Sequence, residues 1–78
     1  MIDSGVRDTA GEKDIAGRAR NLLSESPIAE VRHVRVEQKG DKILLQGRVR
    51  TFYAKQMAQE TVRPALGDLL LVNSVNVE

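Results

Sequence analysis

Basic residues gather in the middle of this chain. Residues 31–63 carry eight Lys or Arg residues against three acids, although the chain of 78 residues has a net charge of only +1. Arginine forks bind phosphate oxygens in bidentate fashion, so this segment contains the residue type that an anionic partner requires. Strand alternation would place Arg35, Arg48 and Arg50 on one open sheet face. The alternative is a solvated strand face whose charges discourage aggregation.

The chain has two aromatic residues, Phe52 and Tyr53, and both lie in this basic segment. Together with Arg48, Arg50 and Lys55 they fall within eight consecutive positions. Proteins that dock on membrane surfaces combine aromatic and basic side chains in this way. We expect one of the two aromatic side chains to pack against the core, which leaves at most one exposed anchor.

A run of three leucines, Leu69, Leu70 and Leu71, is the second feature that points to a partner. Side chains alternate between the two faces of a strand, so three consecutive leucines cannot all reach one core. At least one of them either lies at a helix junction or joins an exposed apolar patch. With Leu44, such a patch would form a dimer contact through the sheet face.

No set of residues suits catalysis or metal binding. The chain lacks cysteine and has a single histidine, His33, so neither a thiolate site nor a multi-histidine site is available. The serines have only His33 as a base, and no nucleotide-binding glycine motif is present. The sequence therefore predicts a protein that is not an enzyme and that has no cofactor and no metal. His33 itself is either a pH sensor or an incidental surface residue.

The spacing of the apolar residues predicts the elements that hold these side chains. Residues 1–11 show no periodicity and are expected to form a flexible tail before a domain over 12–78. We expect a helix over 12–26 that ends before Pro27. Two strands, over 32–37 and 43–49, should follow and be joined by a turn at 39–42. A second helix, capped by Thr51 and ended or kinked by Pro64 near Arg63, should then lead to a strand over 69–77. This order predicts an α+β, two-layer αββαβ domain, a three-stranded mixed sheet with two helices packed on one face.

Length and composition limit what this domain can do. Folding a chain of this size buries only roughly 60% of the surface that its unfolded form exposes, so the core is thin. Hydrophobic residues make up 41% of the sequence and no long apolar run is present, so the chain is expected to fold as a soluble domain. A native start at Met1 predicts a cytoplasmic protein, whereas excision from a longer chain predicts a periplasmic or membrane-associated one.

The order of motifs resembles a known family. The relevant stretches are the strand Ile43-Leu44-Leu45-Gln46-Gly47-Arg48-Val49, a helix with Ala54 and Ala58, and a closing Val72-Asn73-Ser74-Val75-Asn76-Val77. Over residues 12–78 the chain resembles the BON domain, named for bacterial osmotic-stress and nodulation proteins. The resemblance implies that Gly40 is the turn glycine, Gly47 the mid-strand glycine and Asn73 the asparagine of the last strand.

Two departures from the family pattern concern residues 63–70. Gly67 is followed by Asp68 and leucines where family members usually have Gly-Val, and Pro64 interrupts the helix end. These departures affect the expected local geometry and leave the topology unchanged. Gly47 has two interpretations: close approach of a ligand to the backbone, or a bulge or tight packing spot, which we favour.

The resemblance implies a small bacterial module of the cell envelope that binds phospholipid surfaces or partner proteins. The leading hypothesis is therefore a non-enzymatic binding module that docks on an anionic membrane surface or on a protein. Nucleic-acid binding through the basic sheet face is an alternative, although that face lacks the aromatic side chains typical of single-strand readers. A structural or assembly role is a third alternative. We expect a monomer or a weak homodimer.

Overall fold

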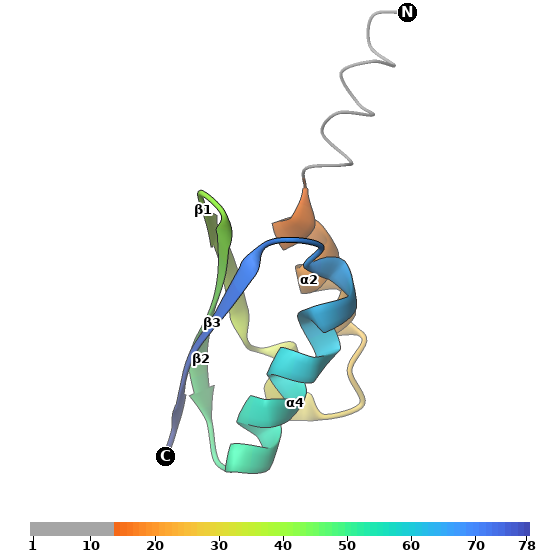
Figure 1. Cartoon of the computed structure of the whole chain (residues 1–78). Coiled ribbons are helices and arrows are strands. Elements are labelled where there is room, and N and C mark those ends of the chain that lie inside the picture. The colour runs from red at the N-terminus through yellow and green to blue at the C-terminus, as the bar shows by residue number, and fades with distance from the viewer. Residues whose placement is uncertain (1–13) are drawn as a thin grey trace, which may run out of the picture.

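Each of the two longer helices begins where a polar side chain caps it. The computed structural model describes residues 14–78, and the predicted tail of residues 1–11 lies outside them (Figure 1). Helix α2, Ile15–Ser24, follows Asp14, whose Oδ1 accepts a hydrogen bond of 2.9 Å from the Gly17 N–H. Helix α4, Phe52–Val62, follows Thr51, whose Oγ1 accepts one of 3.0 Å from Ala54 N–H. The prediction that Thr51 is the N-cap is confirmed.

The prolines end the helices as predicted. Helix α2 stops before Pro27, and α4 gives way to a single 3₁₀ turn, η1, Arg63–Ala65, which contains Pro64. Proline supplies no backbone donor and its ring clashes with the preceding turn, so the α-helix cannot continue through it. Gly67 then takes a φ of 59°, which turns the chain back toward the sheet.

A short helix that the sequence analysis did not predict precedes the first strand. Helix α3, Ala29–Arg32, occupies part of the expected strand 32–37, which begins only at Arg35, and His33 lies at the helix C-cap. The Ser26 hydroxyl accepts a hydrogen bond of 3.1 Å from the Ile28 N–H and so closes the turn before α3. Ile28 and Val31 are three residues apart, which is helical spacing, and Val31 is fully buried. Burial of Val31 therefore outweighs the strand-like alternation nearby.

The three strands form a mixed sheet in the order β1-β2-β3. Strand β1, Arg35–Lys39, pairs antiparallel with β2, Lys42–Val49, through a two-residue turn in which Gly40 has a φ of 58°. Strand β3, Leu70–Val77, pairs parallel with β2 after the crossover through α4. Figure 1 shows the helices on one side of this sheet only. The predicted fold class, a mixed three-stranded sheet with the helices on one face, is confirmed.

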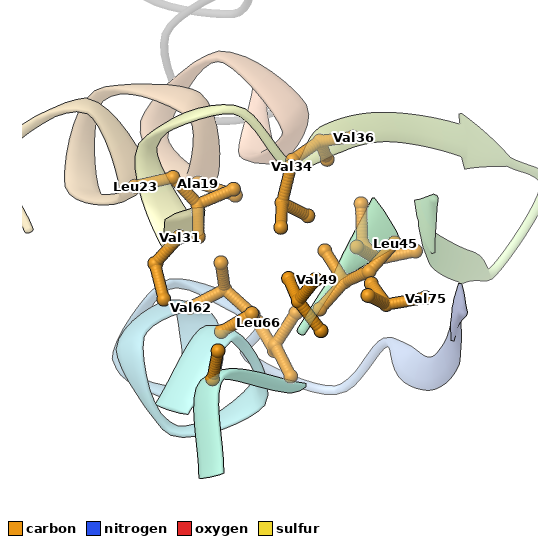
Figure 2. Close-up of a cluster of buried hydrophobic side chains, with 13 residues drawn as sticks. Ala19, Leu23, Val31, Val34, Val36, Leu45, Val49, Val62, Leu66 and Val75 are labelled. Carbon is orange, nitrogen blue, oxygen red and sulfur yellow. The ribbon is translucent and has the colours of Figure 1, made fainter. Parts of the chain in front are cut away.

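The core lies between the sheet and the helices (Figure 2). Helix α4 contributes small side chains at four-residue spacing, Ala54 and Ala58, which let its backbone approach the sheet closely. The fully or nearly fully buried apolar residues come from every element except η1: Ala19, Leu23, Val31, Val34, Val36, Ile43, Leu45, Val49, Ala54, Ala58, Val62, Leu66 and Val75. No helix within residues 14–78 is long and apolar enough to cross a membrane.

One polar side chain, Asn73, lies on the helix-facing side of β3. Its Nδ2 donates to the Lys55 carbonyl oxygen at 3.0 Å and to Gln59 Oε1 at 3.3 Å, both on α4. Its Oδ1 accepts from the Val75 N–H at 3.2 Å. A half-buried amide needs such partners, because an unsatisfied polar group in the interior is costly. Asn73 therefore fixes α4 against the last strand.

We expect Asn73→Ala to destabilise the domain by about 1–3 kcal/mol, because the variant loses these hydrogen bonds and leaves the Val75 N–H without its side-chain partner. Urea denaturation measures the change in the free energy of unfolding. The matched control is Asn76→Ala, on the same strand, whose exposed side chain makes no hydrogen bond within residues 14–78. The control should change stability by less than about 0.5 kcal/mol. Equal midpoints for the two variants would refute the role of Asn73.

Candidate docking site

Phe52 and Tyr53 are consecutive residues in the first turn of α4. Helix α4 begins at the lower end of the domain in Figure 1. Both are exposed, Phe52 by 76% and Tyr53 by 64%. The prediction that one of them packs against the core is wrong. The buried side of α4 is set by Ala54, Ala58 and Val62, and a helix turns by about 100° per residue. The two positions before Ala54 therefore point away from that side.

Two arginines precede these aromatic residues in the chain, Arg48 near the end of β2 and Arg50 just after it. Arg48 Nε is 3.5 Å from Glu78 Oε2, and Arg50 Nε is 4.0 Å from Glu30 Oε2. The Arg50 N–H also donates to Glu30 Oε1 at 3.0 Å. The two arginine side chains are 75% and 89% exposed, and surface ion pairs of this kind contribute little stability. Both guanidinium groups can therefore exchange their carboxylate partner for a phosphate.

Lys55 completes this end of the molecule. It is half-buried one turn into α4, and it forms no salt bridge with any described residue. We call the group formed by Arg48, Arg50, Phe52, Tyr53 and Lys55 the tip. The tip thus combines two exposed aromatic rings with three basic side chains at one end of the domain.

The structure separates the three arginines that the sequence analysis placed on one face. Arg35 pairs with Gln46, and Arg48 lies two residues further along β2, so both point to the side of the sheet without helices. Arg50 lies beyond the end of β2, which stops at Val49, and it turns toward Glu30 of α3. The prediction is therefore wrong for Arg50, because strand alternation has no meaning past the last strand residue.

The helix-free side of the sheet, which we call the open face, has an apolar group at the end near the hairpin turn. Leu70 is 57% exposed, and Val72 beside it is 38% exposed. Leu44 is half-buried and pairs with Val72. Leu69 and Leu71 pack partly against the core, so Leu70 is the leucine of the run that points outward. Val72 was not predicted to belong to this apolar group, although its two-residue spacing from Leu70 was the available signal.

The rest of the open face is polar. By the strand register, it carries Arg35, Glu37, Lys39, Lys42, Gln46, Arg48, Ser74 and Asn76. None of these residues is aromatic. The aromatic residues of the chain lie at the tip, so the tip differs in chemistry from the open face, although Arg48 belongs to both.

Gly47 lies in β2 opposite Val34, the residue before β1. It has a φ of 141°, and a Cβ built there would lie 3.6 Å from Val34 Cα, at ordinary contact distance. Glycine is needed here because of the unusual backbone conformation, since a side chain would have enough space. Val34 is buried against this position, which leaves the glycine facing protein.

His33 is exposed and lines a shallow hollow with Glu30, Arg48, Arg50 and Glu78. Among residues 14–78, no three His, Asp or Glu side chains gather in a way that could hold a metal ion. Every fully buried side-chain nitrogen or oxygen in the described part of the chain has a hydrogen-bond partner. A second open hollow lies beside α2 and is lined mostly by polar side chains, among them Asp14, Arg18, Arg20, Asn21 and Arg32.

The sequence matches no model of a known protein family, and no curated protein matches it significantly.

Proposed function

We propose that this domain is a non-enzymatic module that docks on anionic phospholipid surfaces through the tip. The observation that supports this proposal most strongly is the joint exposure of Phe52 and Tyr53 in one helical turn. These are the two most exposed large hydrophobic residues of the described chain. A partner surface with an apolar layer would cover them.

The interface of a lipid bilayer suits this pair of side chains. Phenylalanine is apolar throughout and enters the acyl boundary, whereas tyrosine combines an apolar ring with a hydroxyl that remains hydrated among the headgroups. Burial of one such ring provides about 1.5–3 kcal/mol. Two rings supply a weak, reversible anchor of the kind that a peripheral protein uses.

The basic side chains of the tip supply the second interaction. Arg48 and Arg50 are among its most exposed residues, and each basic residue near an anionic membrane surface contributes about 1 kcal/mol. Their present partners, Glu30 and Glu78, hold them only through exposed ion pairs. The carboxylates reduce the positive charge of the tip, so binding should require both the arginines and the aromatic rings.

We also propose that the chain is a BON-like domain of the bacterial cell envelope. The αββαβ order of the main elements supports this assignment. Gly40 at the hairpin turn, Gly47 within β2 and Asn73 within β3 also support it. In this proposal, Asn73 joins the last strand to the second main helix.

Nucleic-acid binding is an alternative function for the same surfaces. Proteins that bind single strands stack bases on aromatic side chains that lie within a basic surface. The open face, with Arg35, Lys39 and Lys42, has no aromatic ring, so of the two surfaces only the tip could stack bases, and the oligonucleotide competition below separates this alternative from lipid docking. A protein partner for the tip is the remaining alternative, and the lipid experiment separates it from the proposal.

Co-sedimentation with vesicles tests the aromatic anchor. We expect the domain to bind vesicles that contain anionic phospholipid, and binding should persist with competing single-stranded oligonucleotide. The double variant Phe52→Ala with Tyr53→Ala should lower partitioning roughly tenfold or more, because it removes both rings. The control is Leu70→Ala, another exposed apolar residue outside the tip. Absence of vesicle binding by the unmodified chain, or an equal loss in the control, would refute lipid docking.

Substitution of the arginines tests the electrostatic part of the proposal. Arg48→Gln and Arg50→Gln should each weaken binding to anionic vesicles about fivefold at low salt, and the effect should shrink as salt rises. The control is Arg63→Gln, an exposed arginine paired with Glu60 at 3.1 Å, after the opposite end of α4. The affinity of each of the three variants is measured by titrating the fraction of bound protein against lipid concentration. Equal weakening by the control would indicate only a general effect of net charge.

A further inference from the structure

The two edges of the sheet differ in how they are protected. Strand β1 carries alternating charges at Arg35, Glu37 and Lys39. In addition, the Arg20 guanidinium of α2 donates a hydrogen bond of 3.3 Å from Nη1 to the Val36 carbonyl oxygen. Charged residues and covering side chains are common means of blocking an exposed strand edge. The β1 edge is therefore closed to a further strand.

The β3 edge lacks these protections. Residues Leu70–Val77 include no charged residue and no proline, and the strand is eight residues long. Strand β3 ends the sheet order, so within residues 14–78 no strand pairs with its outer side. A long edge strand without charge is a ready template for pairing with another chain.

The register shows which backbone groups of β3 face outward. The N–H groups of Leu70 and Glu78 donate toward β2, to Asp41 O at 2.9 Å and Val49 O at 2.8 Å. Because these groups alternate along a strand, the outward-facing residues are those of odd number: Leu71, Asn73, Val75 and Val77. Of their N–H groups, that of Val75 has a side-chain partner, Asn73 Oδ1.

We propose that β3 pairs antiparallel with β3 of a second copy of this chain and so forms a continuous six-stranded sheet. The two-fold axis passes through Ser74, a register that sets outward-facing residues opposite one another and overlaps residues 71–77. Val75 then lies opposite Asn73 of the second copy, and Leu71 lies opposite Val77. The Val75 N–H exchanges Asn73 Oδ1 for the Asn73 carbonyl oxygen of the second copy, so this donor stays satisfied.

The composition of β3 argues for a second copy rather than a different partner. A strand that meets itself places like charges close together, and residues 70–77 contain none. An antiparallel pair is also self-complementary in its backbone hydrogen bonds, as a two-fold interface requires. One strand edge buries less surface than a standard protein interface, so the pairing is weak and depends on concentration.

The proposed pairing and the lipid-docking proposal are independent. A two-fold axis perpendicular to the sheet reverses the strand direction, so the two tips would lie at opposite ends of the dimer. Both tips could then not rest on one flat membrane. Measurement of self-association without lipid tests the pairing alone, whatever the outcome of the vesicle experiment.

Sedimentation velocity over a range of concentrations up to about 1 mM tests the pairing. We expect reversible dimerisation of the unmodified chain, and at least about tenfold weaker association for Ser74→Lys, which sets two lysines against each other at the axis. The control is Gln46→Lys. Gln46 pairs with Ser74 in the register and shares the open face, but it belongs to the central strand. Its substitution should leave association unchanged.

Backbone hydrogen exchange provides a second readout at the edge itself. In the unmodified chain, exchange at the Leu71, Asn73 and Val77 N–H groups should slow as the protein concentration rises, and in Ser74→Lys it should not. Circular dichroism of both variants checks that they fold. A chain that stays monomeric throughout, or a dimer that Gln46→Lys weakens as much as Ser74→Lys, would overturn the proposal, the latter result favouring contact through the open face.

Discussion

The contact between α4 and β3 is the interaction on which the rest of the structure depends. Parallel pairing of β2 with β3 requires a crossover, and α4 provides it. The alanines at 54 and 58 let the helix lie close to the sheet, and Asn73 holds the helix backbone at Lys55 to the last strand. The ladder of β2 and β3 joins the strands directly, and the α4 contact buries the helix-facing side of this pair and positions the start of the helix at the end of the sheet.

A domain of this size cannot cover all of its sheet. The helices bury one face, so the open face and both edges remain at the surface. The chain closes the β1 edge with charge and with Arg20, whereas the β3 edge depends on Asn73 alone. The Asn73 side-chain amide joins α4 to β3, and it also accepts a hydrogen bond from the outward-facing Val75 N–H. The residue that stabilises the fold is therefore also the one that covers a backbone donor at the β3 edge.

The tip follows from the same geometry. Strand β2 ends at Val49, Thr51 caps α4, and the buried stripe of the helix begins at Ala54. Side chains at positions 52 and 53 point away from that stripe, so they are exposed whatever their type. Aromatic residues at these positions cost the domain no core packing, and they place apolar surface where a flat partner can reach it.

Local rules in the sequence were enough to determine the main elements. Helical spacing before Pro27, the Thr51 cap, the break at Pro64 and strand alternation after Lys42 each act through neighbouring residues, so the αββαβ order was predictable. Tertiary structure decided what depends on distant contacts. Burial of Val31 made α3 a helix and moved His33 out of the strand, and the position of the Ala54 stripe exposed both aromatic rings. The end of β2 turned Arg50 away from the open face, because its neighbour is Glu30, twenty residues earlier in the chain.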